Sequence, residues 1–167
     1  MKSREQDSLK PKREIPVSAV VAAILAVVVA IGIFVLTEQA PDVTSAESSM
    51  VSELLVSLFG GIGFLYDPTT DLWLGISIRH WAHTAEFWAF GIFATSAAWL
   101  ALKPSFGKTA AVSLAVCAAF SLFDQCHKLF VPGRHFDCFD LVMDALGYGL
   151  AILTVLLLAR LISKRKA

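Results

Sequence analysis

The sequence predicts an all-α, polytopic membrane protein with about four transmembrane helices plus an outer amphipathic helix. The 167-residue chain is 56% hydrophobic and has a mean hydropathy of +0.67, which is too apolar for an ordinary soluble domain. Several of its apolar stretches reach the roughly 20 residues that a helix needs to cross a bilayer. Lysine and arginine gather on alternate connections between these stretches. The length suits a single domain, and because the net charge is zero and no nucleic-acid motif is present, nucleic acid is not an expected partner.

The first apolar stretch spans residues 16–37 and follows a basic tail over residues 1–15. Between Pro16 and Leu36 nearly every residue is Ala, Val, Ile or Leu, so the stretch is long enough to span the hydrocarbon core. A signal peptide has a shorter apolar core with a small-residue cleavage site close behind it. We therefore expect an uncleaved first transmembrane helix that follows a cytoplasmic tail.

Residues 38–77 form a polar-to-mixed connection that we expect outside the cytoplasm. Apolar residues recur through its middle at helical spacing, with Ser52, Glu53 and Ser57 between them. This pattern is typical of an amphipathic helix that lies at the membrane interface, and it also fits a helix packed on the bundle. The apolar face consists of Met50, Leu54, Leu55, Leu58, Phe59 and Ile62.

Residues 78–162 hold three further helices, and a basic tail follows over residues 163–167. Tryptophans at or near the start of the first of these three helices are typical of a membrane interface. These tryptophans are Trp73, Trp81 and Trp88. The helices are expected at 78–102, at 109–124 with an extension toward 130, and at 139–162.

The distribution of basic residues predicts a multi-pass protein of the cell membrane with both termini cytoplasmic. With the N-terminus inside, the cytoplasmic side holds five basic residues in the N-terminal tail, two around residues 103–108 and four near the C-terminus. The outer side holds three, which are Arg79, Lys128 and Arg134. A bias of this kind sets orientation by the positive-inside rule. The polar residues of the second helix and of the last connection are therefore expected on the same, outer side.

Polar residues in the second helix form one stripe. Arg79, His83 and Glu86 lie at positions i, i+4 and i+7 and so share a helix face. Glu86 falls in a stretch otherwise nearly free of charge, where an ionised carboxylate is costly unless it is protonated or paired. His83 and Arg134 are the expected partners. The stripe fits either a ligand-binding or catalytic site or an ion pair that only fixes helix packing.

A second stripe lies in the fourth helix, where Asp137, Asp140 and Asp144 lead from the surface toward Gly147 and Ala151. Asp137 or Asp140 can cap the helix N-terminus and satisfy its free N–H groups. Asp144 lies one turn deeper, where capping does not explain it. The small residues below the carboxylates allow close helix contact.

The connection before the fourth helix adds further polar groups. Asp124 can pair with Lys128 four residues on, or with Arg134 across the turn, because an arginine fork suits carboxylates and phosphates. Cys126 and Cys138 flank the turn and can form a disulfide on an oxidising side. No catalytic residue, cofactor or metal site is assigned. The predicted ligand-binding or polar cluster consists of Arg79, His80, His83, Glu86, Asp124, His127, Arg134, Asp140 and Asp144.

Two elements of the sequence resemble the VanZ-like membrane proteins. The segment from His80 to Phe87, followed by Gly91, resembles the His-x-x-Glu-Phe element of that family. The segment from Asp124 to Gly147, with its Val-Pro-Gly-Arg turn and its Asp-x-x-x-Asp-x-x-Gly run, resembles the second element. The resemblance covers the last three helices and identifies residues 78–162 as a VanZ-like three-helix unit.

The chain departs from the family pattern at Gln125 and Lys128, where the family commonly has an acid and a glutamine. If that acid is catalytic in the family, its replacement alters or removes the chemistry. The resemblance implies an association with resistance to glycopeptide antibiotics, notably teicoplanin. It leads us to expect action at the outer leaflet on an envelope lipid, a glycopeptide or a lipid-linked cell-wall precursor.

Two other functions fit the same residues. A membrane enzyme, such as a metal-assisted hydrolase or transferase on a lipid-linked substrate, would use histidines and carboxylates as ligands. However, the spacing of His80 and His83 is not that of a zinc protease, and no serine nucleophile motif is present. A structural partner subunit would use the polar residues only to lock the bundle.

Overall fold

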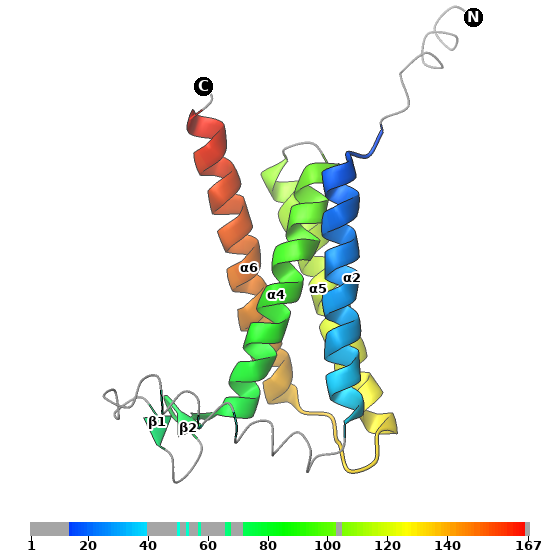
Figure 1. The fold of residues 1–167 in the computed structure, drawn as a ribbon, viewed down its shortest axis with the longest axis vertical. Coiled ribbons are helices and arrows are strands. Elements are labelled where there is room, and N and C mark those ends of the chain that lie inside the picture. The colour runs from blue at the N-terminus through cyan, green and yellow to red at the C-terminus, as the bar shows by residue number, and fades with distance from the viewer. Residues whose placement is uncertain are drawn as a thin grey trace, which may run out of the picture.

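Four long helices lie side by side as a bundle in the computed structural model (Figure 1). The structure describes residues 14–39, 50, 53, 57, 66–67, 72–102 and 105–165. The predicted all-α, membrane-type fold is confirmed. The helices are α2 (Val17–Glu38), α4 (Ile78–Ala101), α5 (Phe106–His127) and α6 (Cys138–Arg165), with a short 3₁₀ turn, η2 (Lys128–Phe130), after α5.

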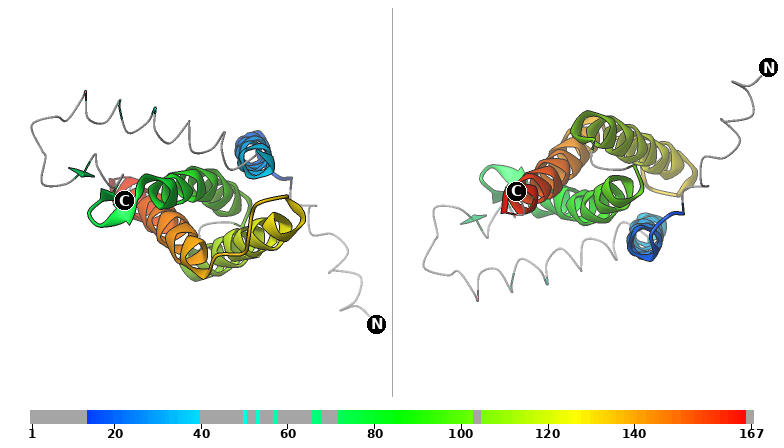
Figure 2. Two further views of the ribbon diagram at one scale, coloured as in Figure 1. Left: turned by 90° about the horizontal axis from the view of Figure 1, so that it is seen from below. Right: turned by 90° about the horizontal axis from the view of Figure 1, so that it is seen from above.

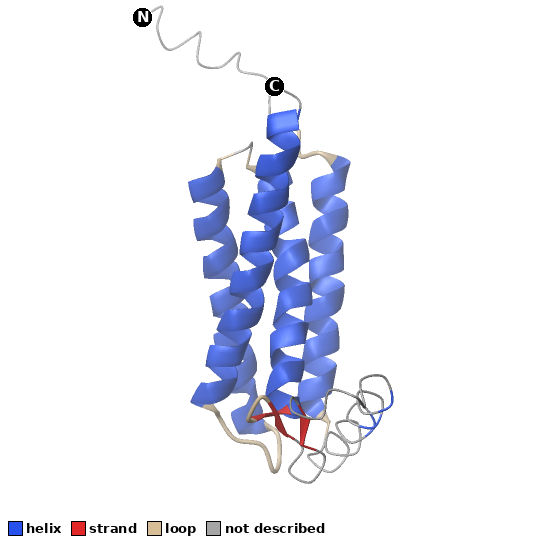
Figure 3. Cartoon of the chain, turned by 90° about the vertical axis from the view of Figure 1, so that its left-hand side faces the viewer, coloured by secondary structure: helices blue, strands red, loops and turns tan. Residues whose placement is uncertain are grey.

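Successive helices run in opposite directions, so the bundle has two distinct ends. The first turn of α2 and the last turn of α6 lie together at one end (Figure 1). The strands and the connection over residues 131–137 lie at the opposite end (Figure 3). We call this second end the loop end.

Among the described residues, three helices are long and apolar enough to cross a membrane: α2, α5 with its η2 extension, and α6. The remaining helix, α4, carries Arg79, His83 and Glu86 in its first half and is not one of the three. It contacts each of the other three helices, and α6 most extensively (Figure 2). We therefore expect α4 to cross the membrane together with its neighbours.

Close contact between α4 and α6 depends on glycine. A Cβ atom on Gly147 would lie 2.3 Å from the carbonyl oxygen of Thr84, and one on Gly91 would lie 2.8 Å from Cβ of Ala151. The Thr84 hydroxyl also donates to the Met143 carbonyl oxygen at 3.1 Å. The small residues expected to allow close packing in the fourth helix do so here.

Away from the loop end, the interior of the bundle is apolar. Phe87, Phe90 and Cys117 are buried, and Phe120 packs against them with its ring centroid 4.8 Å from that of Phe90. Large apolar side chains on α2, α5 and α6 are exposed on the outside of the bundle. This arrangement is expected where lipid, rather than water, surrounds the helices.

Three short antiparallel strands precede α4, and the sequence did not predict them. They are β1 (Tyr66–Asp67), β2 (Leu72–Trp73) and β3 (Ile76–Ser77), in the order β1-β2-β3. Leu74 and Gly75 join β2 to β3, and both have positive φ angles, of 55° and 77°. The Trp81 indole N–H donates to the Trp73 carbonyl oxygen at 3.0 Å and so fixes this hairpin to the start of α4. The expected amphipathic helix lies almost entirely outside the described residues.

Candidate functional site

A buried lysine lies at the centre of the loop end. Lys128 is fully buried, and its ammonium donates to Asp140 Oδ2 at 2.9 Å. The same nitrogen lies 3.7 Å from Asp124 Oδ2 and 3.2 Å from His83 Nε2. A buried ammonium is tolerated only with such partners, because leaving water costs several kcal/mol per ion. The i, i+4 pairing of Asp124 with Lys128 is thus present.

The histidine and the deepest carboxylate extend this network. His83 Nδ1 lies 3.2 Å from Asp144 Oδ1, and His83 Nε2 lies 3.4 Å from Asp140 Oδ2. The Ser121 hydroxyl donates to Asp144 Oδ2 at 2.7 Å. We call Lys128, His83, Asp124, Asp140 and Asp144 the Lys128 network.

All four helices contribute to the surroundings of this network. From α2, the Thr37 hydroxyl donates to Asp124 Oδ1 at 2.7 Å, which ties the first helix to α5. His83 comes from α4, Asp124 and Lys128 come from the end of α5 and η2, and the remaining carboxylates come from α6. Three carboxylates face one ammonium and one imidazole, so the buried network holds more acidic groups than basic ones. It can hold a proton or attract a cation.

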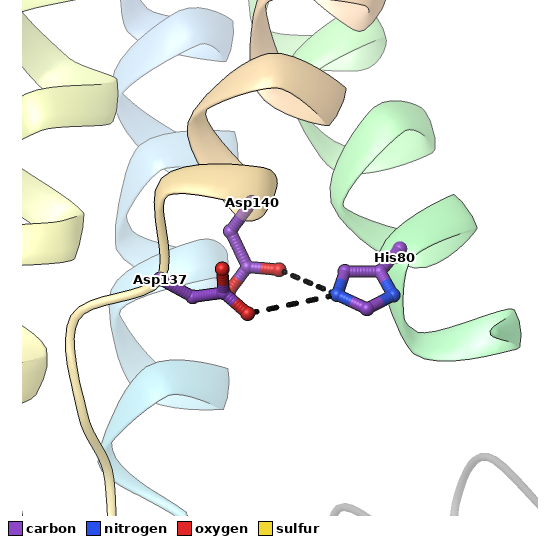
Figure 4. A group of neighbouring side chains, drawn as sticks. All are labelled: His80, Asp137 and Asp140. Carbon is purple, nitrogen blue, oxygen red and sulfur yellow. Dashed lines mark ion pairs between the residues drawn. The ribbon is translucent and has the colours of Figure 1, made fainter. Parts of the chain in front are cut away.

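A second group of polar residues lies nearer the surface (Figure 4). His80 Nε2 points toward two carboxylates, at 3.7 Å from Asp137 Oδ2 and 3.5 Å from Asp140 Oδ1. The other ring nitrogen of His80 lies 2.6 Å from the Ser77 hydroxyl. Asp137 directly precedes α6, and its Oδ1 accepts the backbone N–H of Phe139 at 2.8 Å. Asp140 thus joins this group to the Lys128 network.

Arg134 contacts the end of α2 through hydrogen bonds to backbone carbonyl oxygens. Its guanidinium donates to the Gln39 carbonyl oxygen at 3.1 Å and 3.0 Å and to the Leu36 carbonyl oxygen at 3.2 Å. Both carbonyls lie at the C-terminal end of α2, where the helix dipole favours a cation, and the Leu36 oxygen also accepts the Gln39 backbone N–H at 3.3 Å. Asp124 is held instead by Thr37 and Lys128.

Two other predicted residues lie apart from the Lys128 network. Glu86 is half-buried on α4 and, within the described part of the chain, forms neither of the expected pairs with His83 or Arg134. His127 binds the Glu38 carboxylate through Nε2 and stacks on Phe34 at 4.5 Å between ring centroids, on the side facing α2.

The cysteines at the loop end are free thiols. Cys126 and Cys138 are both exposed, and no bond joins them, so the disulfide that the sequence allowed is not formed. Cys117 is buried in the apolar interior.

A family model described as VanZ/LLP1 matches residues 21–159. The chain belongs to the VanZ/LLP1 family. The match includes most of α2 as well as the last three helices, so it reaches further than the two elements found in the sequence. The whole Lys128 network lies within the matched range. No curated protein and no solved structure matches the chain.

Several members of the site were missed from the sequence. Lys128 was recognised only as a possible partner of Asp124 and as a departure from the family pattern, yet it is the centre of the network. Its position directly after an apolar helix was the available signal. Thr37 and Ser121 gave no signal, because a lone hydroxyl in an apolar helix is common and usually bonds to its own helix.

Proposed function

We propose that this family member binds a lipid-linked cell-wall precursor or a related envelope lipid at the outer leaflet, and thereby confers resistance to glycopeptides such as teicoplanin. The anionic head group lies at the loop end, and the tail lies in a groove along the bundle. The loop end faces outward, with both termini cytoplasmic, as the distribution of basic residues predicts. The observation that carries this proposal is an apolar groove that leads toward the loop end, where Arg79 and Arg134 lie.

The groove has a volume of about 840 Å³ and is lined by α2, α4 and α5. Small side chains on α2 leave room for it, and apart from Ser113 the lining is apolar. From Ala19 to Phe34 the helix rises about 22 Å, which is most of the ~30 Å hydrocarbon core. An ordinary acyl chain reaches only about half of that core. The length of the groove therefore favours a long isoprenoid tail.

The groove and the polar site meet at Phe34. This residue lines the groove, and its ring stacks on His127 at the loop end. One turn further along α2, Thr37 bonds to Asp124 of the Lys128 network. A lipid whose tail follows the groove therefore brings its head group to the loop end.

Two arginines at the loop end suit a phosphate. Burial lowers the pKa of Arg134, and the positive charge of nearby Arg79 lowers it further. The guanidinium stays protonated at neutral pH, because the ordinary pKa of an arginine side chain lies far above neutral. The charges of Asp124, Asp140 and Glu86 act on the pKa of Arg134 in the opposite direction. An arginine side chain can hold a phosphate through two hydrogen bonds, so Arg79 and Arg134 are the residues that would recognise the head group.

Binding is tested on the purified protein with undecaprenyl phosphate, and with uncharged undecaprenol as the comparison. Arg79→Gln removes one arginine, and we expect it to weaken binding of the phosphate by about tenfold or more. Ala23→Phe fills the groove and should weaken both probes. The matched controls are Lys108→Gln, an exposed cation at the opposite end, and Ile24→Phe, an exposed residue of α2 outside the groove. If the wild type binds both lipids equally, the head-group assignment is wrong. If Ala23→Phe binds both lipids as tightly as the wild type does, the tail assignment is wrong.

Resistance is tested in a Gram-positive host that produces the wild type or each variant, with the abundance of each protein measured alongside. We expect the wild type to shift teicoplanin susceptibility, and Arg79→Gln to lose that shift while Lys108→Gln keeps it. If the wild type causes no shift with teicoplanin or vancomycin, the resistance part of the proposal is wrong. A shift that follows protein abundance alone would favour a structural subunit instead.

A further inference from the structure

We propose that His80, Asp137 and Asp140 form a binding site for one divalent metal ion of the zinc class at the loop end (Figure 4). Each residue offers one ligand atom, and these atoms all lie within 4.8 Å of one another. His80 comes from the first turn of α4, Asp137 directly precedes α6, and Asp140 lies in the first turn of α6. The site is independent of the proposed lipid binding and does not rest on it.

The separations of the ligand atoms suit a tetrahedral ion. His80 Nε2 lies 3.7 Å from Asp137 Oδ2 and 3.5 Å from Asp140 Oδ1. A tetrahedral ion with bonds of about 2.1 Å holds its ligand atoms about 3.4 Å apart. Small side-chain rotations would therefore bring all three atoms to bonding distance. Two carboxylates match the charge of a divalent ion, and the imidazole favours a first-row metal over magnesium or calcium.

The second polar atom of each ligand is already held by another group. The Ser77 hydroxyl lies 2.6 Å from His80 Nδ1, the Phe139 N–H donates to Asp137 Oδ1, and Lys128 donates to Asp140 Oδ2. These contacts leave the three remaining atoms directed at one point. Metal sites are typically built this way, because such outer contacts fix the orientation of each ligand.

One ligand atom lacks any hydrogen bond where the structure describes its surroundings. Asp140 is fully buried, and its Oδ1 has no hydrogen-bond partner, although it is directed at the His80 ring. Burying a carboxylate oxygen without a hydrogen-bond partner costs free energy, and a bound cation would offset that cost. Lys128 occupies the other oxygen and does not fill this position.

The Ser77 side chain, at the start of α4, contacts His80 rather than the helix backbone. It occupies the N-cap position, where a serine side chain normally accepts a backbone N–H of the first turn. Its side chain makes no such bond and contacts His80 Nδ1 instead. If Nδ1 carries the proton and donates it to Ser77, Nε2 keeps the lone pair that a metal needs.

A protonated His80 that only pairs with the carboxylates is the competing explanation. An imidazolium N–H would be expected to donate to an oxygen at about 2.9 Å. Both oxygens lie well beyond that distance. An ion placed between the three atoms accounts for the separations better.

Two of the three ligands are partly exposed at the loop end. The His80 side chain is 23% exposed and that of Asp137 is 35% exposed. Three protein ligands leave a fourth position of a tetrahedral ion open to water or to an anionic oxygen.

The test uses full-length protein in detergent, purified without a polyhistidine tag, stripped with a chelator and titrated with Co²⁺. We expect one equivalent per chain with the visible absorption band of a tetrahedral site, and displacement by Zn²⁺. His80→Gln and Asp137→Asn should abolish the band. Ser77→Ala should keep the band and weaken affinity by about tenfold, which a purely structural serine would not do.

The matched controls are His127→Gln and Glu38→Gln, which change a histidine and a carboxylate at the same end of the bundle but outside the three ligands. Both should bind Co²⁺ like the wild type. The proposal is wrong if the wild type shows no band, if His80→Gln keeps it, or if the controls lose it as well. Should His80→Gln fail to fold, the Ser77→Ala affinity decides between the two explanations.

Discussion

The half of the bundle near the loop end and the half near the termini bury different kinds of side chain. Near the loop end, Lys128, Asp124, Asp140 and Asp144 are almost completely buried. In the other half, the buried groups of the described residues are apolar or carry only a hydroxyl, as Thr95 and Thr109 do. Both halves belong to the same four helices, so ionised groups are not needed to hold such a bundle together. We infer that the buried ions of the loop end serve a site.

The largest expected difference between the halves follows from Lys128→Met. Removing the ammonium leaves Asp124 and Asp140 buried without their main cation, which should destabilise the protein by about 3–5 kcal/mol. The measurement is unfolding in detergent, with Lys108→Met as control. Lys108 is exposed in the other half, so its replacement should change stability by no more than about 0.5 kcal/mol. Equal stability of the two variants would mean that the Lys128 network is not formed as described.

An intermediate effect is expected from glycines on α6. Gly147→Ala places a Cβ 2.3 Å from the Thr84 carbonyl oxygen, so α4 and α6 must move apart, at a cost of about 1–3 kcal/mol. Gly149→Ala meets nothing within 4 Å and should be neutral or slightly stabilising. The same unfolding measurement checks both. If Gly149→Ala proves the more harmful, the packing of α6 against α4 is assigned to the wrong face.

The smallest expected difference in stability is between variants of two buried threonines. Thr37→Val removes the hydrogen bond to Asp124 and should cost about 1–2 kcal/mol, because a buried carboxylate loses a donor. Thr109→Val, in the other half, removes a hydroxyl with no partner among the described residues, so it should be neutral or stabilising. A double-mutant cycle of Thr37→Val with Asp124→Asn should show coupling. If the two effects simply add, the stabilising contribution of Thr37 does not come from its hydrogen bond to Asp124.

The sequence predicted the apolar helices well because membrane length and composition leave few alternatives. The α4–α6 packing was also predictable, since glycine and alanine recur on one face of the fourth helix. The partners of each ion were harder to predict. Glu86 and Arg134 were expected to form an ion pair, but the Arg134 guanidinium donates to backbone carbonyl oxygens at the C-terminal end of α2, and the sequence does not show which backbone acceptors a side chain will reach. The strands were missed because each has only two residues, too short for an alternating pattern.

The central claim is that the loop end, with its cations and its candidate metal site, faces the outside of the cell. The native cysteines can serve as labelling sites, because Cys126 and Cys138 are exposed at that end and Cys117 is buried. A membrane-impermeant maleimide added to intact cells should label the wild type, and the Cys126→Ser/Cys138→Ser double variant should remain unlabelled. Labelling of the wild type only after permeabilisation would place the loop end in the cytoplasm. That result would contradict the proposed action at the outer leaflet.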